Sequence, residues 1–373
     1  MDWGKRFPSL RRNLYFASCS QGPMSVDVLE AVKSYLSSIV EEGNPWDEWM
    51  KTVYEAAACF GEIVQANEEE ICPHYSASSA LISLISSFTP GRRNKVVTTE
   101  LDYPSIGVPL AALKKRGFDV EIIRAEQGLV DVEKFRKKVD EKTLLVATFH
   151  VSALNGYMQD VKALSEICEA KGAYLLLDAY QSIGAVPIDV KKMGVDFLVA
   201  GTTKFLLGIP GAGFLYARKD IFDDLEPTAV SWFSQRDPFL FGPEDLDYRD
   251  DAKRFEMGTW SVVSMYAARA GMRLIMRVGV DSIWRRIMKT RNYFVEEVED
   301  AGFQMFSPDL EKIGPTVSLF FGQDSSTVER RLRSKRVIVS ARGPGVRFAH
   351  HFFNNREQVD RVVEILRKHF RRN

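Results

Sequence analysis

The sequence predicts an α/β fold in which helices flank a mostly parallel β-sheet, followed by a smaller α+β unit. From about residue 95 onward, short β-rich segments alternate several times with helical segments. The β-rich segments are almost continuously apolar, which is typical of strands whose two faces are both covered by helices. Past residues 211–218 the composition changes, and long helices and a second group of strands follow.

The expected sheet elements follow one another between residues 94 and 218. Apolar and β-branched runs predict strands at residues 94–100, 118–126, 143–151, 173–180, 195–201 and 211–218. Helical spacing of apolar residues predicts helices at residues 104–117, 131–142 and 160–172. Strands that alternate with helices in this way favour a parallel sheet.

The second unit begins after a long irregular connection, residues 227–251, which is rich in aromatic, proline and charged residues. Helices are expected at residues 265–279, 282–302 and 357–370, and strands at 316–322, 336–341 and 346–353. We therefore expect a large domain over residues 21–260 and a small domain over residues 261–373. The N-terminal segment, residues 1–20, is expected to pack with the small domain.

Composition excludes several classes of function. The 50 basic and 50 acidic side chains cancel, so no overall charge favours nucleic acid or an anionic membrane. The sequence contains no membrane-spanning apolar run, no secretory signal and no cysteine pattern typical of a disulfide framework. His350 and His351 would point to opposite faces of a strand, so no metal site is expected. We expect a cytoplasmic protein that binds a small ligand.

Two charged side chains follow neighbouring strands of the expected sheet. Asp178 comes after the strand sequence AYLLL, and Lys204 follows the next strand. Ligands of open parallel sheets bind at the carboxyl ends of the strands, so these side chains should lie close together. Pyridoxal 5′-phosphate needs a lysine amine for its Schiff base and a carboxylate that keeps its ring nitrogen protonated. Ser76, Ser78 and Ser79, at an expected helix start, could face its phosphate.

The segment DAYQSIGAVPIDVKKMGVDFLVAGTTKFLLGIPGAGFLYARKD resembles the central signature of class V aminotransferases. This family includes cysteine desulfurases, kynureninase and isopenicillin N epimerase. The similarity runs from NLYFASCSQGP through RFEMGTW to VRFAHHFFNN, which is nearly the whole chain. It implies pyridoxal phosphate as cofactor. It also implies the fold type I of such enzymes, with a mostly parallel seven-stranded sheet in the large domain and a smaller α+β domain.

The resemblance also implies roles for single residues. Lys204 would form the Schiff base, Asp178 would pair with the ring nitrogen, and Gln181 would bond the ring hydroxyl. The residues expected to contact the phosphate are Ser78, Ser79 and Thr202.

The resemblance implies roles for two further residues, which follow the lysine in the sequence. Thr259, in the pair Gly258-Thr259, would reach the phosphate of the other subunit, which implies a homodimer with shared active sites. Arg347 would take the substrate α-carboxylate, a task that suits the planar guanidinium fork.

The sequence departs from the family pattern at several positions. Desulfurases carry a nucleophilic cysteine on the loop before the arginine, but residues 340–345 read SARGPG, so desulfuration is disfavoured. Ala153 stands where an asparagine is expected, and Asn155 could replace it as a substrate-binding residue. Thr203 precedes the lysine, and Tyr103 is the candidate for stacking on the pyridine ring.

These residues favour an aminotransferase that interconverts a small amino acid and a keto acid, with the freed Lys204 amine as the base. A lyase or epimerase of the same family that uses no catalytic cysteine is the alternative. A catalytically silent scaffold with this fold is a second alternative, which the intact Asp178, Gln181 and Lys204 disfavour.

Overall fold

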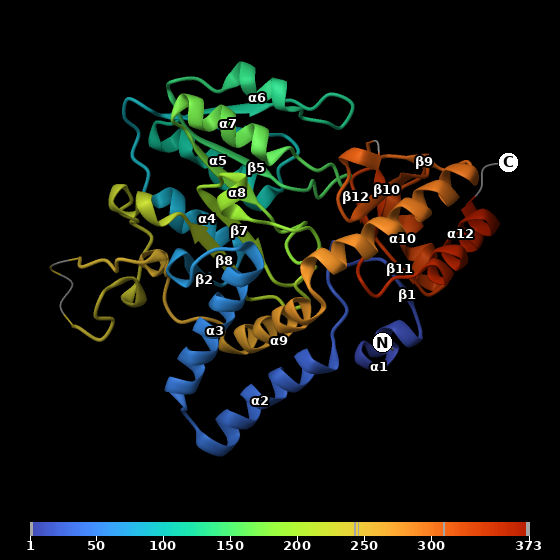
Figure 1. Cartoon of the computed structure of the whole chain (residues 1–373), viewed down its shortest axis with the longest axis horizontal. Coiled ribbons are helices and arrows are strands. Elements are labelled where there is room, and N and C mark those ends of the chain that lie inside the picture. Colours follow the sequence, from blue (N-terminus) through green and yellow to red (C-terminus); the bar gives the residue numbers. More distant parts are fainter. Residues whose placement is uncertain (1–2, 242–243, 245, 309, 371–373) are drawn as a thin grey trace.

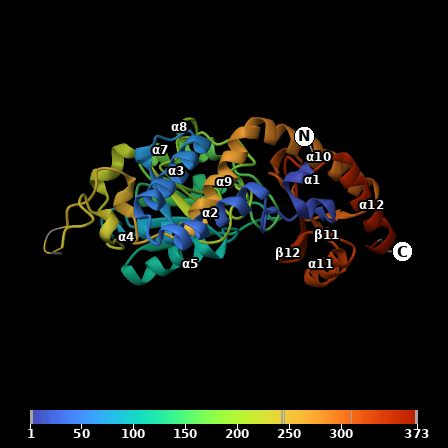
Figure 2. The ribbon, with the colours of Figure 1, turned by 90° about the horizontal axis from the view of Figure 1, so that it is seen from below.

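The computed structural model describes residues 3–241, 244, 246–308 and 310–370. Its elements form a large unit and a small unit that lie side by side in both Figure 1 and Figure 2. Within the described residues, no helix is long and apolar enough to cross a membrane.

A seven-stranded sheet forms the centre of the large unit, in the order β2-β8-β7-β6-β5-β3-β4. Its strands are β2 (Ile71–His74), β3 (Lys95–Thr99), β4 (Asp119–Ile123), β5 (Thr143–Phe149), β6 (Tyr174–Asp178), β7 (Phe197–Gly201) and β8 (Gly213–Ala217). All neighbours pair in parallel except β8, which is antiparallel to both β2 and β7. The predicted mostly parallel seven-stranded sheet is therefore confirmed.

Both faces of this sheet are buried, which explains the continuous apolar strands. On β6, Leu175 and Leu177 belong to one apolar cluster, whereas Leu176 between them belongs to the cluster on the other face. The covering helices are α3 (Trp46–Val64), α4 (Ala77–Ser86), α5 (Pro104–Ala112), α6 (Val132–Lys138), α7 (Val161–Lys171), α8 (Val190–Met193) and α9 (Val262–Val278), and α2 (Val26–Glu42) packs mainly on α9.

The small unit contains an antiparallel sheet in the order β12-β13-β10-β9. Its strands are β9 (Gln304–Met305), β10 (Thr316–Phe320), β12 (Ser340–Arg342) and β13 (Gly345–Ala349), and its helices are α10 (Val280–Asp300), α11 (Ser325–Ser334) and α12 (Arg356–Phe370). Phe294, Val317 and Phe348 contribute to its core.

The N-terminal segment reaches this small unit. It begins with the short helix α1 (Trp3–Arg6) and continues to β1 (Leu14–Tyr15), which pairs in parallel with β11 (Val337–Ile338). Helix α9, by contrast, packs against α2 and α3, and its apolar residues join the core of the large unit. The domain boundary expected near residue 260 stays a prediction. In the structure, Ile283 and Ile287 of α10 still join the core of the large unit, and Phe294 of the same helix joins the core of the small unit.

Two local features differ from the elements expected from the sequence. Residues 104–117 form α5 followed by a 3-10 turn over Leu113–Arg116 rather than one helix. Strand β2 has no clear sequence pattern because it contains Pro73, which lacks an N–H group. An edge strand tolerates proline, and β2 lies at the edge of the sheet.

Candidate active site

The candidate site lies where β6 and β7 end. These strands pair in parallel, and Asp178, the last residue of β6, lies opposite Val199, two residues before β7 ends at Gly201. Lys204 follows three positions later, on the turn that leads to β8. Burial lowers the pKa of Lys204 to about 8, although the negative charge of Asp178 partly opposes this shift. About half of the lysine is therefore a neutral, nucleophilic amine near pH 8.

Asp178 is buried, and its Oδ1 atom accepts a hydrogen bond from the Tyr180 backbone N–H at 2.9 Å. Burial raises the pKa of Asp178, whereas that hydrogen bond and the charge of Lys204 lower it. A carboxylate in this setting would be stabilised by a cationic partner such as a protonated pyridine nitrogen.

Two tyrosine rings flank the Lys204 amine. Its Nζ atom lies 3.9 Å from the ring centroid of Tyr180 and 5.4 Å from that of Tyr103. The Tyr180 hydroxyl lies 2.8 Å from Thr203 Oγ1. A Cβ atom at Gly201 would lie 2.4 Å from Tyr180 Cζ, so only glycine leaves room for this ring. Tyr103 was predicted at the site; Tyr180 was not, although it lies inside the matched DAYQ segment.

The side chain of Gln181 is tied to the N-terminal segment and leaves one acceptor unused. Its Nε2 group donates to the Cys19 carbonyl at 3.0 Å, and its Oε1 atom is buried without a partner. A buried acceptor of this kind suits a ligand hydroxyl. Just after this segment, Gly22 N–H donates to the Thr203 carbonyl at 2.7 Å. This hydrogen bond holds the turn that carries Lys204, which we call the lysine turn.

The expected phosphate-binding serines lie at the start of α4. Ser76 caps the helix, accepting from Ser79 N–H at 3.1 Å, and the Ser79 hydroxyl returns to the Ser76 carbonyl at 2.9 Å. Ser78 is partly exposed. A Cβ atom at Gly213 would lie 2.5 Å from the Ser76 carbonyl carbon, so β8 passes directly against this helix end. The positive end of a helix dipole favours anions, and the phosphate roles of the serines stay predictions.

Thr202 is buried beside this turn, and its hydroxyl is already engaged. It donates toward the carbonyls of Ile209 at 3.3 Å and Ala212 at 3.4 Å. A phosphate contact from Thr202 would have to replace these hydrogen bonds, so its role also stays a prediction.

Arg347 on β13 is a buried cation that has no carboxylate partner among the described ion pairs. Nη1 donates to the Ala153 carbonyl at 2.7 Å, and Nη2 donates to Ser340 Oγ at 2.7 Å. Its positive charge contributes to the lowered pKa of Lys204. Because burying an unpaired charge is costly, this arrangement favours an incoming carboxylate.

Asn155 lies in a turn after β5 that forms a backbone hydrogen bond with the segment before β10. Its Nδ2 group donates to the Gly128 carbonyl at 2.8 Å, and its Oδ1 atom accepts from Tyr157 N–H at 3.2 Å. The next residue, Gly156, accepts from Gly314 N–H at 2.8 Å. The amide group keeps one further N–H donor and one further acceptor lone pair, so the substrate-binding role of Asn155 stays a prediction.

Thr259 is exposed on the surface of this chain and follows Gly258, which has a φ of +81°. That backbone conformation favours glycine. The predicted contact of Thr259 with the phosphate of a partner subunit stays a prediction.

The thiols and imidazoles offer no alternative centre. All four cysteines are buried and unpaired, and burial raises the pKa of Cys168 to about 12. His350 and His351 are buried, and His351 Nε2 lies 3.1 Å from the Phe205 carbonyl. In the described part of the chain, no three His, Cys, Asp or Glu side chains gather where they could hold a metal ion.

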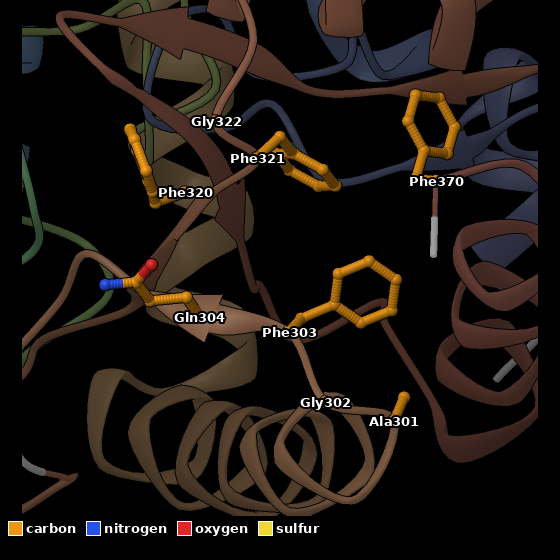
Figure 3. A pocket seen from close by; sticks show the side chains of 8 residues that line it. All are labelled: Ala301, Gly302, Phe303, Gln304, Phe320, Phe321, Gly322 and Phe370. Atoms are coloured by element: carbon orange, nitrogen blue, oxygen red, sulfur yellow. The ribbon is translucent and has the colours of Figure 1, made fainter. Parts of the chain in front are cut away.

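A separate cavity of about 310 Å³ lies in the small unit (Figure 3). Phenylalanine rings dominate its lining, which consists of Ala301, Gly302, Phe303, Gln304, Phe320, Phe321, Gly322 and Phe370. None of these side chains is titratable or nucleophilic, so this cavity does not compete with the Lys204 site as a catalytic centre.

The chain is similar to known proteins over almost its whole length. Residues 14–365 match the family model described as aminotransferase class-V. The uncharacterized aminotransferase YcbU of Bacillus subtilis (strain 168) is 34% identical over 358 residues, which cover 96% of this chain and 95% of the relative.

Two solved structures confirm the predicted fold. The apo structure of a cysteine desulfurase from Thermococcus onnurineus NA1 has a TM-score of 0.88 at 25% identity, covering 99% of this chain and 97% of that one. A C-DES mutant with glycine covalently linked to the PLP cofactor has a TM-score of 0.89 and covers 98% of both chains. At 18% identity, the second likeness shows the fold alone.

Proposed function

The chain belongs to the aminotransferase class-V family of pyridoxal-phosphate enzymes, and from this premise we propose that it is an aminotransferase that acts on a small amino acid. The observation that carries the proposal is the placement of Lys204. Its amine, with a pKa of about 8, lies among a carboxylate, two tyrosine rings and a buried arginine that has no anionic partner.

The residues at the site fit the cofactor. Asp178 would hold the ring nitrogen, the unpartnered Gln181 Oε1 would accept the ring hydroxyl, and the start of α4 would receive the phosphate. When bound, pyridoxal phosphate supplies an aldehyde for the lysine amine and a ring that withdraws electrons from the substrate α-carbon.

The protein side chains would then bind the substrate and move one proton. Arg347 would hold the α-carboxylate with its remaining N–H donors, which fixes the α-carbon relative to Lys204. The Lys204 amine, being largely neutral above pH 8, would take the α-proton and hold it at Nζ. Return of this proton to a position other than the α-carbon would distinguish transamination from epimerisation.

The absence of a thiol between residues 340 and 345 supports transamination over desulfuration. Cys19 lies close to the site, because its backbone carbonyl accepts a hydrogen bond from Gln181 Nε2. It belongs to the N-terminal segment and not to residues 340–345, where desulfurases of this family carry their nucleophilic cysteine.

Incubation of purified protein with pyridoxal phosphate, single amino acids and a keto acid acceptor tests the proposal. We expect a new keto acid and a new amino acid in equal amounts. Release of ammonia with pyruvate and no amino transfer would support the lyase alternative instead. Racemised substrate would support an epimerase, and a yellow protein that turns over no amino acid would support the silent scaffold.

We also propose that the enzyme works as a homodimer with shared active sites. The exposed position of Thr259 supports this, since its hydroxyl is available to another subunit. Mixing two variants that are each inactive, one changed at Lys204 and one at Thr259, tests whether the active sites are shared.

A further inference from the structure

A second arginine lies on the same face of the small sheet as Arg347. Strands β12 and β13 are antiparallel, with Ser340 opposite Arg347 and Arg342 opposite Gly345. Residues that lie directly opposite each other point to the same face, and the hydrogen bond from Arg347 to Ser340 Oγ shows that these two do. Arg342 lies two positions after Ser340, so its side chain leaves the same face.

Arg342 extends toward the lysine of the large unit. Its guanidinium carbon lies 5.5 Å from the ring centroid of Tyr103. The same ring lies 5.4 Å from Lys204 Nζ. Tyr103 therefore contacts a cation from each unit, and its ring lies next to both the reactive amine and the Arg342 guanidinium.

No acidic side chain neutralises Arg342 among the described residues. It is exposed and forms no described ion pair or side-chain hydrogen bond. The carboxylate of Glu329 lies nearby but is occupied, since Oε2 accepts from Ala341 N–H at 2.9 Å and Oε1 pairs with Arg333 at 3.3 Å. Asp178 is the carboxylate that acts on Lys204, and it is needed for the cofactor ring.

A neutral amino acid brings one carboxylate, which Arg347 would bind. Arg342 would then keep its positive charge with no anionic partner among the described side chains. A second carboxylate on the substrate side chain would give Arg342 an anionic partner. A guanidinium fork binds a carboxylate through two parallel hydrogen bonds.

We propose that Arg342 is a specificity residue that binds a side-chain carboxylate, so that the preferred substrate is a dicarboxylic amino acid. This inference rests on the proposed function, because it assigns the α-carboxylate to Arg347. It makes Arg342 the counterpart of Arg347 at the other end of the substrate, with Tyr103 beside it.

Substrate pairs of equal size provide the first test. We expect wild-type enzyme to use glutamate over glutamine, or aspartate over asparagine, with a kcat/KM at least about 10-fold higher. Arg342→Gln should lower kcat/KM for the acid by about 10-fold, mainly through KM, and should leave the amide within about 3-fold. Arg330→Gln removes an exposed arginine from α11 in the same unit and should change neither value.

Binding without turnover provides a second, independent readout. Calorimetric titration of the protein with glutarate and with its monoamide should show that glutarate binds about 10-fold more tightly. Arg342→Gln should abolish that difference, while Arg330→Gln should retain it.

The outcomes separate the two proposals. Equal use of acid and amide substrates by wild-type enzyme, or an unchanged preference in Arg342→Gln, would overturn the role of Arg342 and leave transamination standing. A glutarate preference that depends on Arg342, in a protein that transaminates no amino acid, would support the carboxylate-binding position and contradict the proposed aminotransferase activity.

Discussion

The hydroxyl groups of Tyr180 and Thr203 lie 2.8 Å apart and link the ends of two neighbouring strands. Tyr180 follows β6 and Thr203 follows β7, so this hydrogen bond ties the aspartate side of the site to the lysine turn. The Tyr180 ring also lies 3.9 Å from Lys204 Nζ, and Gly201 leaves the space that the ring occupies. We infer that Tyr180 is a positioning residue, which holds the lysine turn against the end of β6.

Substitutions around this ring should have graded effects. Tyr180→Phe keeps the ring and removes one hydrogen bond, so we expect kcat to fall by about 3-fold to 10-fold. Gly201→Ala places a Cβ atom 2.4 Å from Tyr180 Cζ and should displace the ring, lowering kcat by about 100-fold or more. Steady-state kinetics and the visible spectrum of the bound cofactor would be measured together.

Gly91→Ala is the matched control for this pair, because a Cβ atom at Gly91 meets nothing within 4 Å. It should leave kcat unchanged. If Gly201→Ala were as active as the control, the Tyr180 ring would have no positioning role.

The rate at which Lys204 captures pyridoxal phosphate should depend on pH. Only the neutral amine is nucleophilic, and burial lowers the pKa of Lys204 to about 8. The rate should therefore rise with pH and reach half of its maximum near pH 8. Stopped-flow absorbance, with borohydride trapping and peptide mass spectrometry to locate the modified residue, would give the midpoint.

Two variants should move this midpoint in opposite directions. Asp178→Asn removes a negative charge that raises the pKa of Lys204, so the midpoint should fall. Arg347→Met removes a positive charge that lowers this pKa, so the midpoint should rise. A wild-type midpoint near pH 10.4, the ordinary value for lysine, would show that the amine is not buried at this site.

Much of this site could be predicted because its parts occupy positions that sequence reveals directly. Asp178 and Lys204 follow strands with clear apolar patterns, and carboxyl ends of neighbouring parallel strands meet at one edge. Tyr180 could have been found by the same reasoning, since it lies between Asp178 and Gln181. Its importance depends on the glycine at position 201, which is a spatial relationship rather than a pattern.

Other features depend on contacts between distant segments. The environment of Arg342 follows from the β12–β13 register and from the approach of Tyr103, 239 positions earlier in the chain. The hydrogen bonds of Asn155 reach Gly128, in a loop with no expected role. Sequence spacing alone could not reveal that the Asn155 side chain was already engaged.

Asp102, next to Tyr103, should make stability depend on pH. Its Oδ2 atom accepts from Thr98 Oγ1, Thr99 N–H and Thr99 Oγ1, whereas Oδ1 is buried without a partner. Burial raises the pKa of Asp102 to about 7, although these hydrogen bonds partly oppose the shift. The folded chain therefore retains a proton that the unfolded chain releases above its ordinary pKa, and the free energy of unfolding falls as the pH rises from about 4 to 7.

Asp102→Asn should remove this loss, because an amide oxygen can accept the same hydrogen bonds and does not ionise. Relative to wild type, its free energy of unfolding should increase between pH 5 and pH 8 by about 2 kcal/mol. Urea unfolding at both pH values measures this difference. Asp119→Asn, at an exposed position, is the control, and equal pH dependence in wild type and Asp102→Asn would contradict the prediction.

Mixing two inactive variants should restore activity if the active sites are shared between subunits. Lys204→Ala removes the reactive amine, and Thr259→Asp places a negative charge where the phosphate of the partner site is expected. In a mixed dimer with shared sites, both defects fall in one site and the other site has wild-type residues. Random reassociation of equal amounts, after denaturation and refolding together, should therefore restore roughly one quarter of wild-type activity.

If Thr259 instead serves its own subunit, each site of the mixed dimer carries one defect and activity should stay at the level of the separate variants. A Thr259→Asp variant that binds pyridoxal phosphate as tightly as wild type would remove Thr259 from the phosphate site altogether.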